Sequence, residues 1–339
     1  MLTLGIETSC DDTAASVVRD GSYVLSSVVS SQDDIHSKYG GIVPELASRR
    51  HIEMIIPVVD EALIRAGATL ADIDGLAVTE GPGLVGSILV GLNFAKSVAY
   101  AAKKPLTGVN HIAAHPLAAF LKETPKADVP DFPFVALIAS GGHTTLVRYD
   151  GFTDYSILGS TLDDAAGEAF DKVAKLLGLG FPGGAIIDRL ARDGDQRAFA
   201  FTRPYMAKTS LDFSFSGIKT AALEHVRAFK MELLPPDAVS NIAASFQEAV
   251  VDVLVVKAIR ALVRTGSRCL VVAGGVACNS RLRVRLQEAA SAEGARLFIP
   301  APRYCSDNAA MIAAMGFNRL QKGDTSTLDL NARPTWEGF

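Results

Sequence analysis

The sequence contains few cysteines and little excess charge. Its 339 residues include four cysteines, at positions 10, 269, 278 and 305, and no two of them form a CxxC pair. Because so sparse a set cannot build a disulfide framework, we expect a reducing, cytoplasmic setting. The 33 lysines and arginines against 37 aspartates and glutamates give a formal net charge of −4. Bulk charge therefore does not indicate a nucleic-acid partner, and any such binding must use local basic patches or a helper protein.

Long apolar runs and the Walker-type phosphate-binding motif are also missing. The apolar stretch 249–256 is interrupted by Asp252, and it is far shorter than the roughly 20 residues of a membrane span. The N-terminus carries Glu7 and no basic-then-apolar run, so we expect no signal peptide and no contact with a membrane. GxxxxGKS/T does not occur, which disfavours a Walker-type NTPase.

The order of predicted strands and helices indicates two similar halves. Strands are expected at 2–6, 14–18, 23–29, 75–79 and 106–109, with helices at 43–66 and from about 84 to 102. After the polar segment 122–133, strands at 134–139, 144–149, 153–158 and 269–273 and helices at 162–177, 240–264 and from 279 follow in a similar order. With 49% hydrophobic residues, this predicts a two-lobed α/β protein with a duplicated βββαβαβα core and a cleft between the lobes.

The lobes are expected at 1–125 and 126–307. The second lobe would carry a helical insertion at about 181–238. A C-terminal helix at about 308–325 is expected to pack back on the first lobe.

Three glycine turns follow predicted strands, at Glu80–Gly83, Ser140–His143 and Gly274–Val276. Glycine allows a ligand to approach the backbone closely, and bare N–H groups in such turns bind phosphate. The alternative is that each turn only reverses the chain. Because two of the three lie at comparable points of the second half, contacts to phosphate and adenosine are the favoured interpretation.

Two histidines have the spacing of a metal site. His111 and His115 are four residues apart, which places both imidazoles on one face of a helix. Asn110 is a plausible N-cap of that helix, and Pro116 should shorten or distort it. The alternative is a pair of surface or capping histidines. No glutamate lies between them, so a metalloprotease of the HExxH kind is disfavoured.

Carboxylates occur near the same predicted loops. Glu7, Asp11 and Asp12 follow the first strand, and Asp307 follows the strand at 297–299. Further carboxylates are Asp163, Asp164, Glu168 and Asp171, of which the first two could merely cap a helix. One carboxylate with two histidines is a common ligand set for a divalent metal. The arginines at 281, 283 and 285 spread around a helix, so a solvated face is their default interpretation.

Several strings together resemble a known family. GIETSCDDTAASVV, ELASRRH, TEGPGLVGSILVG, VNHIAAH, SGGHTTL, FSFSGIKTA, AGGVACN and RYCSDNAAMIA occur in the order typical of the bacterial tRNA N6-adenosine threonylcarbamoyltransferases (TsaD), once labelled O-sialoglycoprotein endopeptidases. The resemblance runs from about residue 3 to 320. It implies the two-lobed actin/Hsp70/hexokinase-like ATPase superfold.

The resemblance also implies a reaction and its participants. Threonylcarbamoyl would pass from threonylcarbamoyl-adenylate to N6 of the adenosine at position 37, beside the anticodon, in ANN-decoding tRNAs, with release of AMP. TsaB-like and TsaE-like proteins would assist, and a TsaC-type enzyme would supply the adenylate. The cofactor would be one divalent metal ion, usually Fe²⁺, with Zn²⁺ or Mg²⁺ as alternatives.

The resemblance assigns roles residue by residue. His111, His115 and Asp307 would hold the metal. In the acyl transfer that follows from the resemblance, Asp11 or Asp12 would accept the proton of the attacking amine. The phosphate and acyl group would lie along Ala139, Ser140, Gly141, Gly142 and His143, the ribose or neighbouring groups near Asp171, Gly184 and Asp188, and the adenine near Asn279. The chain departs from the family in having Asp11-Asp12 for Asp-Glu, and Ala113, Ala114 and Pro116 for glutamate, glycine and an aliphatic residue.

Other functions remain open at the level of the sequence. A small-molecule kinase of the same superfold would also place phosphate-binding turns around a cleft, but it would not need the histidine pair. A non-catalytic nucleotide-binding subunit of a tRNA-modifying complex would bind ligand without turnover. The old peptidase label is opposed by the missing glutamate between the histidines.

Overall fold

The computed structural model describes residues 1–124, 128–205, 209–228 and 235–336. The chain divides into two compact units. Unit 1 comprises residues 1–130, 151–155 and 300–339, and unit 2 comprises residues 131–150 and 156–299. Residues 300–307, assigned from the sequence to the second lobe, thus belong to unit 1.

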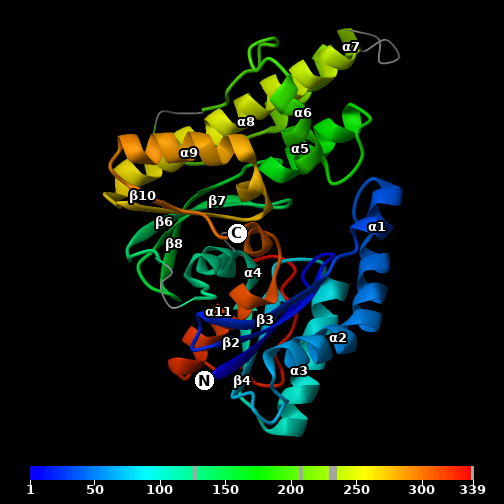
Figure 1. The fold of residues 1–339 in the computed structure, drawn as a ribbon, viewed down its shortest axis with the longest axis vertical. Helices are drawn as coiled ribbons and strands as arrows, with labels where there is room; N and C mark the ends of the chain where they lie inside the picture. The colour runs from blue at the N-terminus through cyan, green and yellow to red at the C-terminus, as the bar shows by residue number, and fades with distance from the viewer. Residues whose placement is uncertain (125–127, 206–208, 229–234, 337–339) are drawn as a thin grey trace. The chain divides into compact units, whose positions relative to one another are not determined.

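Unit 1 is built on a five-stranded mixed sheet (Figure 1). The strands are β1 (Leu2–Glu7), β2 (Thr13–Arg19), β3 (Tyr23–Ser30), β4 (Gly75–Gly81) and β5 (Leu106–Asn110), in the order β3-β2-β1-β4-β5. β1, β2 and β3 form an antiparallel meander, whereas β4 and β5 run parallel to β1. Because parallel strands end at the same edge, the residues that follow β1, β4 and β5 come together there.

Helices cover both faces of this sheet. The helices of unit 1 are α1 (Asp33–His36), η1 (Ser37–Tyr39), α2 (Pro44–Ala66), α3 (Val85–Ala102), α4 (His111–Ala114), η2 (His115–Phe120), α10 (Pro302–Cys305) and α11 (Ala309–Gln321). Leu4 and Ile6 of β1 join the core formed with α2 and α3. Gly5, between them, faces the other side of the sheet, where an added Cβ would lie 2.2 Å from the Ala309 carbonyl oxygen of α11.

The boundaries of α2 follow from its terminal residues. Pro44 occupies the first turn, where its missing N–H costs nothing, and Gly67 ends the helix with φ of 62°. The predicted helix at 43–66 is therefore confirmed.

Unit 2 repeats the same strand order. Its strands are β6 (Phe134–Ala139), β7 (Thr144–Tyr149), β8 (Tyr155–Ser160), β9 (Cys269–Ala273) and β10 (Arg296–Phe298), in the order β10-β9-β6-β7-β8. As in unit 1, the first strand pairs antiparallel with the second and parallel with the fourth. The predicted recurrence of the strand pattern is therefore confirmed.

The helices of unit 2 are α5 (Ala166–Leu176), α6 (Gly183–Leu190), η3 (Ala191–Asp193), α7 (Ser216–Ala228), α8 (Pro236–Thr265), η5 (Gly275–Cys278) and α9 (Ser280–Ala292). The predicted insertion at 181–238 contains α6, η3 and α7, and its residues 206–208 and 229–234 lie outside the described residues.

The start of α5 differs from the prediction. α5 begins at Ala166 and not near 162. Asp163 instead accepts hydrogen bonds from the Phe215 N–H at 2.8 Å and the Ser216 hydroxyl at 2.7 Å. Asp163 therefore caps the start of α7. Because α7 lies more than 50 residues further along the chain, local sequence does not predict this contact.

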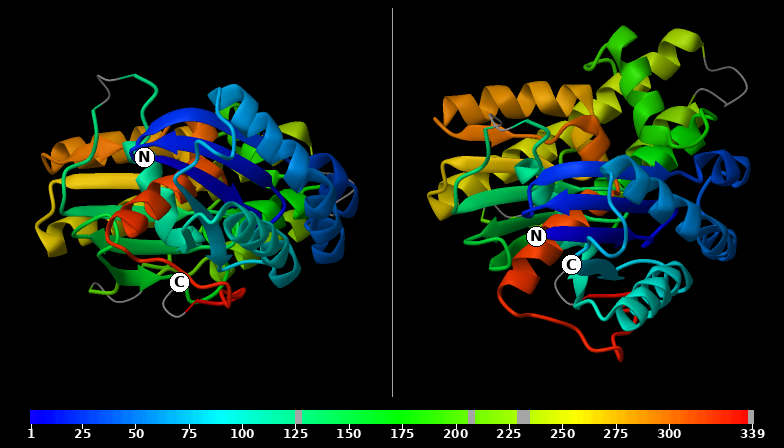
Figure 2. Two further views of the ribbon diagram at one scale, coloured as in Figure 1. Left: turned by 90° about the horizontal axis from the view of Figure 1, so that it is seen from below. Right: turned by 60° about the horizontal axis from the view of Figure 1, so that its bottom comes forward.

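The segment after α11 runs back along unit 1 toward α3 (red in Figure 2). We call residues 324–336 the C-terminal strap. The Ser326 N–H donates to the Leu106 carbonyl of the edge strand β5 at 2.7 Å, and the Lys96 ammonium of α3 donates to the Leu330 carbonyl at 3.0 Å. At the strap's end, Arg333 pairs with the buried carboxylate of Glu80 at 2.7 Å.

One described helix, α3, is long and apolar enough to cross a membrane by length and composition alone. Its residues Ile88, Leu92, Ala95 and Ala99 pack in the core of unit 1. A third of its residues are buried, so α3 packs one face against the core and leaves the rest exposed or partly exposed.

Removing the arginine of the strap should destabilise the protein. In Arg333→Ala the carboxylate of Glu80 stays buried without its cation, which should lower the free energy of unfolding by roughly 1–3 kcal/mol. Urea titration measures this loss. The control is Arg65→Ala, which breaks an exposed ion pair on α2 and should change stability little. Equal effects of the two substitutions would contradict the role of the strap.

Candidate metal centre and neighbouring loops

His111, His115 and Asp307 meet in unit 1. Their nearest ligand atoms form a triangle: His111 Nε2 lies 3.2 Å from His115 Nε2 and 3.4 Å from Asp307 Oδ1, and His115 Nε2 lies 3.5 Å from Asp307 Oδ1. Both histidines are buried. The three residues form a group that could hold a metal ion, as the sequence suggested.

The spacing of this triangle fits a first-row divalent ion. Nitrogen and oxygen ligands lie about 2.0–2.2 Å from such an ion, so two ligands of a tetrahedral site are about 3.4 Å apart. The three observed separations bracket this value. Two imidazoles and one carboxylate leave further coordination positions for a substrate or water, which is the arrangement of catalytic and not of structural sites.

The histidines are positioned by a short helix at the end of β5. The Asn110 side-chain oxygen accepts the Ala113 N–H at 2.9 Å, so the predicted N-cap is confirmed. α4 ends at Ala114, and a 3-10 helix that begins at His115 and contains Pro116 continues it. The expected shortening by proline is also found. His115 keeps helical backbone angles, so both imidazoles stay on one face.

Glu7, the last residue of β1, holds His111 from behind. Its Oε2 lies 2.7 Å from His111 Nδ1 and accepts the Thr79 hydroxyl at 2.6 Å. Its Oε1 accepts the Ser9 N–H. A carboxylate on the far nitrogen of a histidine fixes the ring and leaves Nε2 to a metal. The sequence placed Glu7 among nearby carboxylates but not in this role.

Charge and burial act against each other in this cluster. Burial would raise the pKa of Glu7, but the charge of His111 outweighs it and lowers that pKa. Burial would likewise lower the pKa of His111, whereas Glu7 and Asp307 raise it well above its ordinary value. Burial lowers the pKa of His115. His111 thus carries positive charge between two carboxylates, and His115 is neutral, the form in which imidazole binds metal.

Asp11 and Asp12 lie in the loop between β1 and β2. Burial, with the nearby negative charge of Asp307, raises the pKa of both carboxyls, that of Asp12 to about 8. One oxygen of Asp12 is buried without a hydrogen-bond partner. This loop therefore carries two carboxylates whose proton affinity is increased, close to the candidate metal centre.

Two of the predicted glycine turns lie side by side in unit 2. The turn Ser140–His143 joins β6 to β7, and Gly274 follows β9, which is parallel to β6. A Cβ on Gly274 would lie 2.3 Å from the Ala139 carbonyl oxygen. Added Cβ atoms on Gly141 and Gly142 would meet nothing within 4 Å. This edge of the sheet therefore presents an open loop, as ligand sites at the carboxyl ends of parallel strands do.

The remaining predicted site residues of unit 2 lie at the starts of helices or accept hydrogen bonds from N–H groups there. Asp171 of α5 accepts the Gly183 N–H at 2.7 Å, beside Gly184 at the start of α6. Asp188 of α6 accepts the Ser280 N–H at 3.1 Å. Asn279 caps α9 through the Leu282 N–H at 2.9 Å and donates to Gln247 at 2.7 Å. These contacts give Asp171, Asp188 and Asn279 structural roles, and their ligand contacts stay predictions.

The remaining glycine turn, Glu80–Gly83 in unit 1, is covered and is not open to a phosphate. The Gly83 N–H donates to the Pro334 carbonyl at 3.1 Å, and a Cβ on Gly81 would lie 1.9 Å from the Arg333 carbonyl oxygen. The C-terminal strap thus covers the turn Glu80–Gly83. The glycines are needed here for close packing of backbone on backbone.

The arginines of α9 are held by acidic side chains. Arg281 pairs with Glu248 at 2.7 Å, and Arg285 pairs with Asp252 at 3.0 Å. Arg203 pairs with the same Asp252 at 3.1 Å. Arg281 and Arg285 are therefore ion-paired within unit 2 and do not form the freely solvated face that was their default interpretation.

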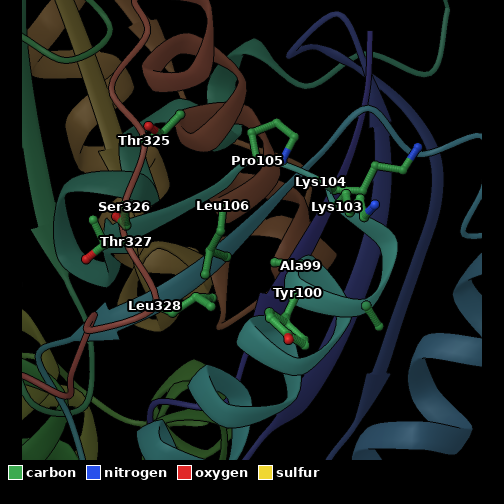
Figure 3. A pocket seen from close by; sticks show the side chains of 11 residues that line it. Ala99, Tyr100, Lys103, Lys104, Pro105, Leu106, Thr325, Ser326, Thr327 and Leu328 are labelled. Atoms are coloured by element: carbon green, nitrogen blue, oxygen red, sulfur yellow. The ribbon is translucent and has the colours of Figure 1, made fainter.

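A separate pocket of about 660 Å³ lies at the opposite end of β5 (Figure 3). Leu106, which begins β5, lines it together with Tyr100, Lys104, Ser326 and Leu328. His111 follows the other end of this five-residue strand, about 16 Å away at 3.3 Å per residue. The pocket contains none of the predicted site residues.

Removing the charge of Glu7 should weaken metal binding. Glu7→Gln keeps the size of the side chain but loses the carboxylate that orients His111. Loss of such a group costs about 10–100-fold in metal affinity. Competition with a chromogenic chelator for Zn²⁺ or Co²⁺ measures the dissociation constant. The control, Glu53→Gln, changes an exposed glutamate of α2. If Glu7→Gln binds the ion as tightly as this control, Glu7 has no such role.

The raised pKa of Asp12 predicts a pH-dependent stability. The pKa of the Asp12 carboxyl is about 8 in the folded protein and about 4 in the unfolded chain. Between these two pH values the unfolded chain loses the proton and the folded protein keeps it, so this carboxyl lowers the stability as the pH rises. Asp12→Asn removes this cost. In samples treated with a chelator, the gain in melting temperature of Asp12→Asn over wild type should grow from pH 4 to pH 8 and then level off. A gain that is constant over this range would contradict the assignment.

Comparisons with known proteins show the family to which the chain belongs. The family model for tRNA N6-adenosine threonylcarbamoyltransferase (TsaD) matches residues 23–314. A relative of that name from Syntrophotalea carbinolica is 55% identical over 336 residues, which cover 99% of this chain and 96% of the relative.

Solved structures with low sequence identity show the fold alone. Full-length HypF in its phosphate- and nucleotide-bound form has a TM-score of 0.61 at 15% identity, over 96% of this chain and 56% of HypF. Component A of the (R)-2-hydroxyglutaryl-CoA dehydratase of Acidaminococcus fermentans has a TM-score of 0.54 at 15% identity, over 95% and 99%. With the two mixed sheets, these likenesses confirm the expected actin/Hsp70/hexokinase-like superfold. By its family-model match and its full-length relatives, the chain belongs to the TsaD family of tRNA N6-adenosine threonylcarbamoyltransferases.

Proposed function

We propose that this chain transfers a threonylcarbamoyl group to N6 of an adenosine in tRNA. This is the activity that the names of its relatives give for those proteins. The observation that carries the proposal is the triangle of His111, His115 and Asp307 in a chain that matches such relatives over almost its whole length. The donor would be threonylcarbamoyl-adenylate, and the acceptor the adenosine at position 37 of ANN-decoding tRNAs.

The chemistry is an acyl transfer from a mixed anhydride. The N6 amine attacks the carbamoyl carbon, a C–N bond forms, the bond from that carbon to the phosphate oxygen breaks, and AMP leaves. The donor is already activated, so the protein chiefly has to position the reactants and stabilise the charge on the departing phosphate. No covalent intermediate with the protein is needed.

Asp11 or Asp12 would take the proton that the attacking amine loses. Their raised pKa values make each carboxylate, once ionised, a stronger base than an exposed aspartate. Glu7 would hold the ring of His111 so that its Nε2 faces the ion. The N–H groups of Gly141 and Gly142 lie on an open turn, where they would donate to the phosphate or acyl oxygens.

A divalent ion fits the donor set of His111, His115 and Asp307. When bound, it would supply Lewis-acid polarisation of a carbonyl or phosphoryl oxygen. We propose Fe²⁺ as this ion, from the family resemblance. The ribose would lie near Asp171, Gly184 and Asp188, and the adenine near Asn279, in roles additional to the helix contacts that these side chains make.

The reaction would involve further proteins. We propose TsaB-like and TsaE-like partners and a cytoplasmic setting in which a TsaC-type enzyme supplies the adenylate. The net charge of −4 and the neutralised arginines of α9 support a need for partners in binding tRNA.

Loss of either histidine should remove the metal and the activity together. Wild type, His111→Ala and His115→Ala are compared for metal content and for transfer in an assay with threonylcarbamoyl-adenylate, the partner proteins and unmodified tRNA, followed by nucleoside analysis. We expect activity to fall more than about 100-fold, the upper limit for a group that merely supports a ligand. His225→Ala, on α7 of unit 2, is the matched control. Unchanged metal content in both variants would remove the proposed metal site.

A further inference from the structure

His51 contacts both ends of the loop that carries Asp11 and Asp12. It lies on α2 and is fully buried. Its Nε2 lies 3.0 Å from the carbonyl oxygen of Cys10, the residue before the aspartate pair. Its Nδ1 lies 2.8 Å from the hydroxyl of Thr13, the residue after the pair. One imidazole therefore spans the two aspartates from the side of the helix.

The two contacts determine how the ring is protonated. A carbonyl oxygen can only accept a hydrogen bond, so Nε2 must carry the proton that it donates to Cys10. Burial also lowers the pKa of His51, so the ring is neutral and Nδ1 accepts the hydrogen of the Thr13 hydroxyl. Both ring nitrogens are thus satisfied in a site with no contact to solvent.

The contact with Cys10 fixes the backbone that leads into Asp11. The peptide bond after Cys10 is trans, and its atoms lie in one plane. Holding the carbonyl oxygen therefore holds the orientation of the whole Cys10–Asp11 peptide. Upstream, the Ser9 carbonyl accepts the Leu84 N–H at 2.8 Å, and the Thr8 hydroxyl donates to the Ser87 carbonyl at 2.8 Å. The loop is anchored on both sides of the aspartate pair.

We propose that His51 is a positioning residue that holds the Asp11–Asp12 loop in the geometry needed for proton transfer. The inference rests on the proposed function, because it assigns to these aspartates the proton of the attacking amine. Displacement of a reacting group by about 1 Å can cost about 100-fold in rate. A fully buried imidazole with both nitrogens bonded to one loop is suited to prevent such a displacement.

Two substitutions separate the contacts of His51. In His51→Gln the side-chain amide can reach the place of Nε2 and donate to Cys10. In His51→Asn the shorter side chain reaches only the place of Nδ1, beside Thr13. We expect His51→Asn to lower kcat by about tenfold or more with little change in KM for threonylcarbamoyl-adenylate, and His51→Gln to restore kcat to within about threefold of wild type. Metal content should be the same in all three proteins.

Amide hydrogen exchange of the full-length proteins gives a readout that does not depend on activity. Exchange in a peptide covering residues 8–13 should be faster in His51→Asn than in wild type and near wild type in His51→Gln. His225→Asn, in unit 2, is the control and should change neither quantity. A His51→Asn protein with wild-type kcat and wild-type exchange would overturn the inference.

The outcomes also separate this inference from the proposed function. If wild type transfers the group and both His51 variants lose the same activity through a lower melting temperature alone, the residue is merely structural and the inference is wrong. If wild type fails to transfer the group in the complete assay, the proposed function is overturned, and the catalytic purpose of the loop falls with it.

Discussion

The site depends on one constraint, the closeness of three lone-pair donors inside unit 1. Nε2 of His111, Nε2 of His115 and Oδ1 of Asp307 lie within 3.5 Å of one another. Two imidazoles and a carboxylate gain from such closeness only when positive charge lies among them, either a proton on His111 or a metal ion. The sheet topology produces the arrangement. β1 ends at Glu7 and β5 ends just before His111, at one edge of a parallel set, and the loop before α11 brings Asp307 to the same place.

Local sequence predicted the features that depend on local physics. The spacing of His111 and His115, the N-cap by Asn110 and the shortening by Pro116 each involve neighbours within one or two helical turns. Asp307 could be joined to the histidines only by the family resemblance. The bond from Glu7 to His111 joins residues 104 positions apart, and only the order of strands in the folded sheet reveals it. The same holds for Asp163, whose partners lie on α7.

The two units differ in how their predicted site residues are used. In unit 1 the candidate metal ligands and the aspartate loop are supported by buried side chains outside both, namely Glu7 and His51. In unit 2 the predicted ligand residues Asp188 and Asn279 also cap a helix. In the proposed function, the same side chains thus contact the ligand and cap a helix. Substitution of such a residue changes stability and binding together, so its role in binding cannot be read from loss of activity alone.

The most direct test of the account is anomalous diffraction from crystals of the protein loaded with a divalent transition metal. The account predicts one ion bound by Nε2 of His111, Nε2 of His115 and the carboxylate of Asp307, with Glu7 on the far nitrogen of His111. An ion held by other residues, or full occupancy elsewhere with these three side chains hydrogen-bonded only to one another, would contradict it.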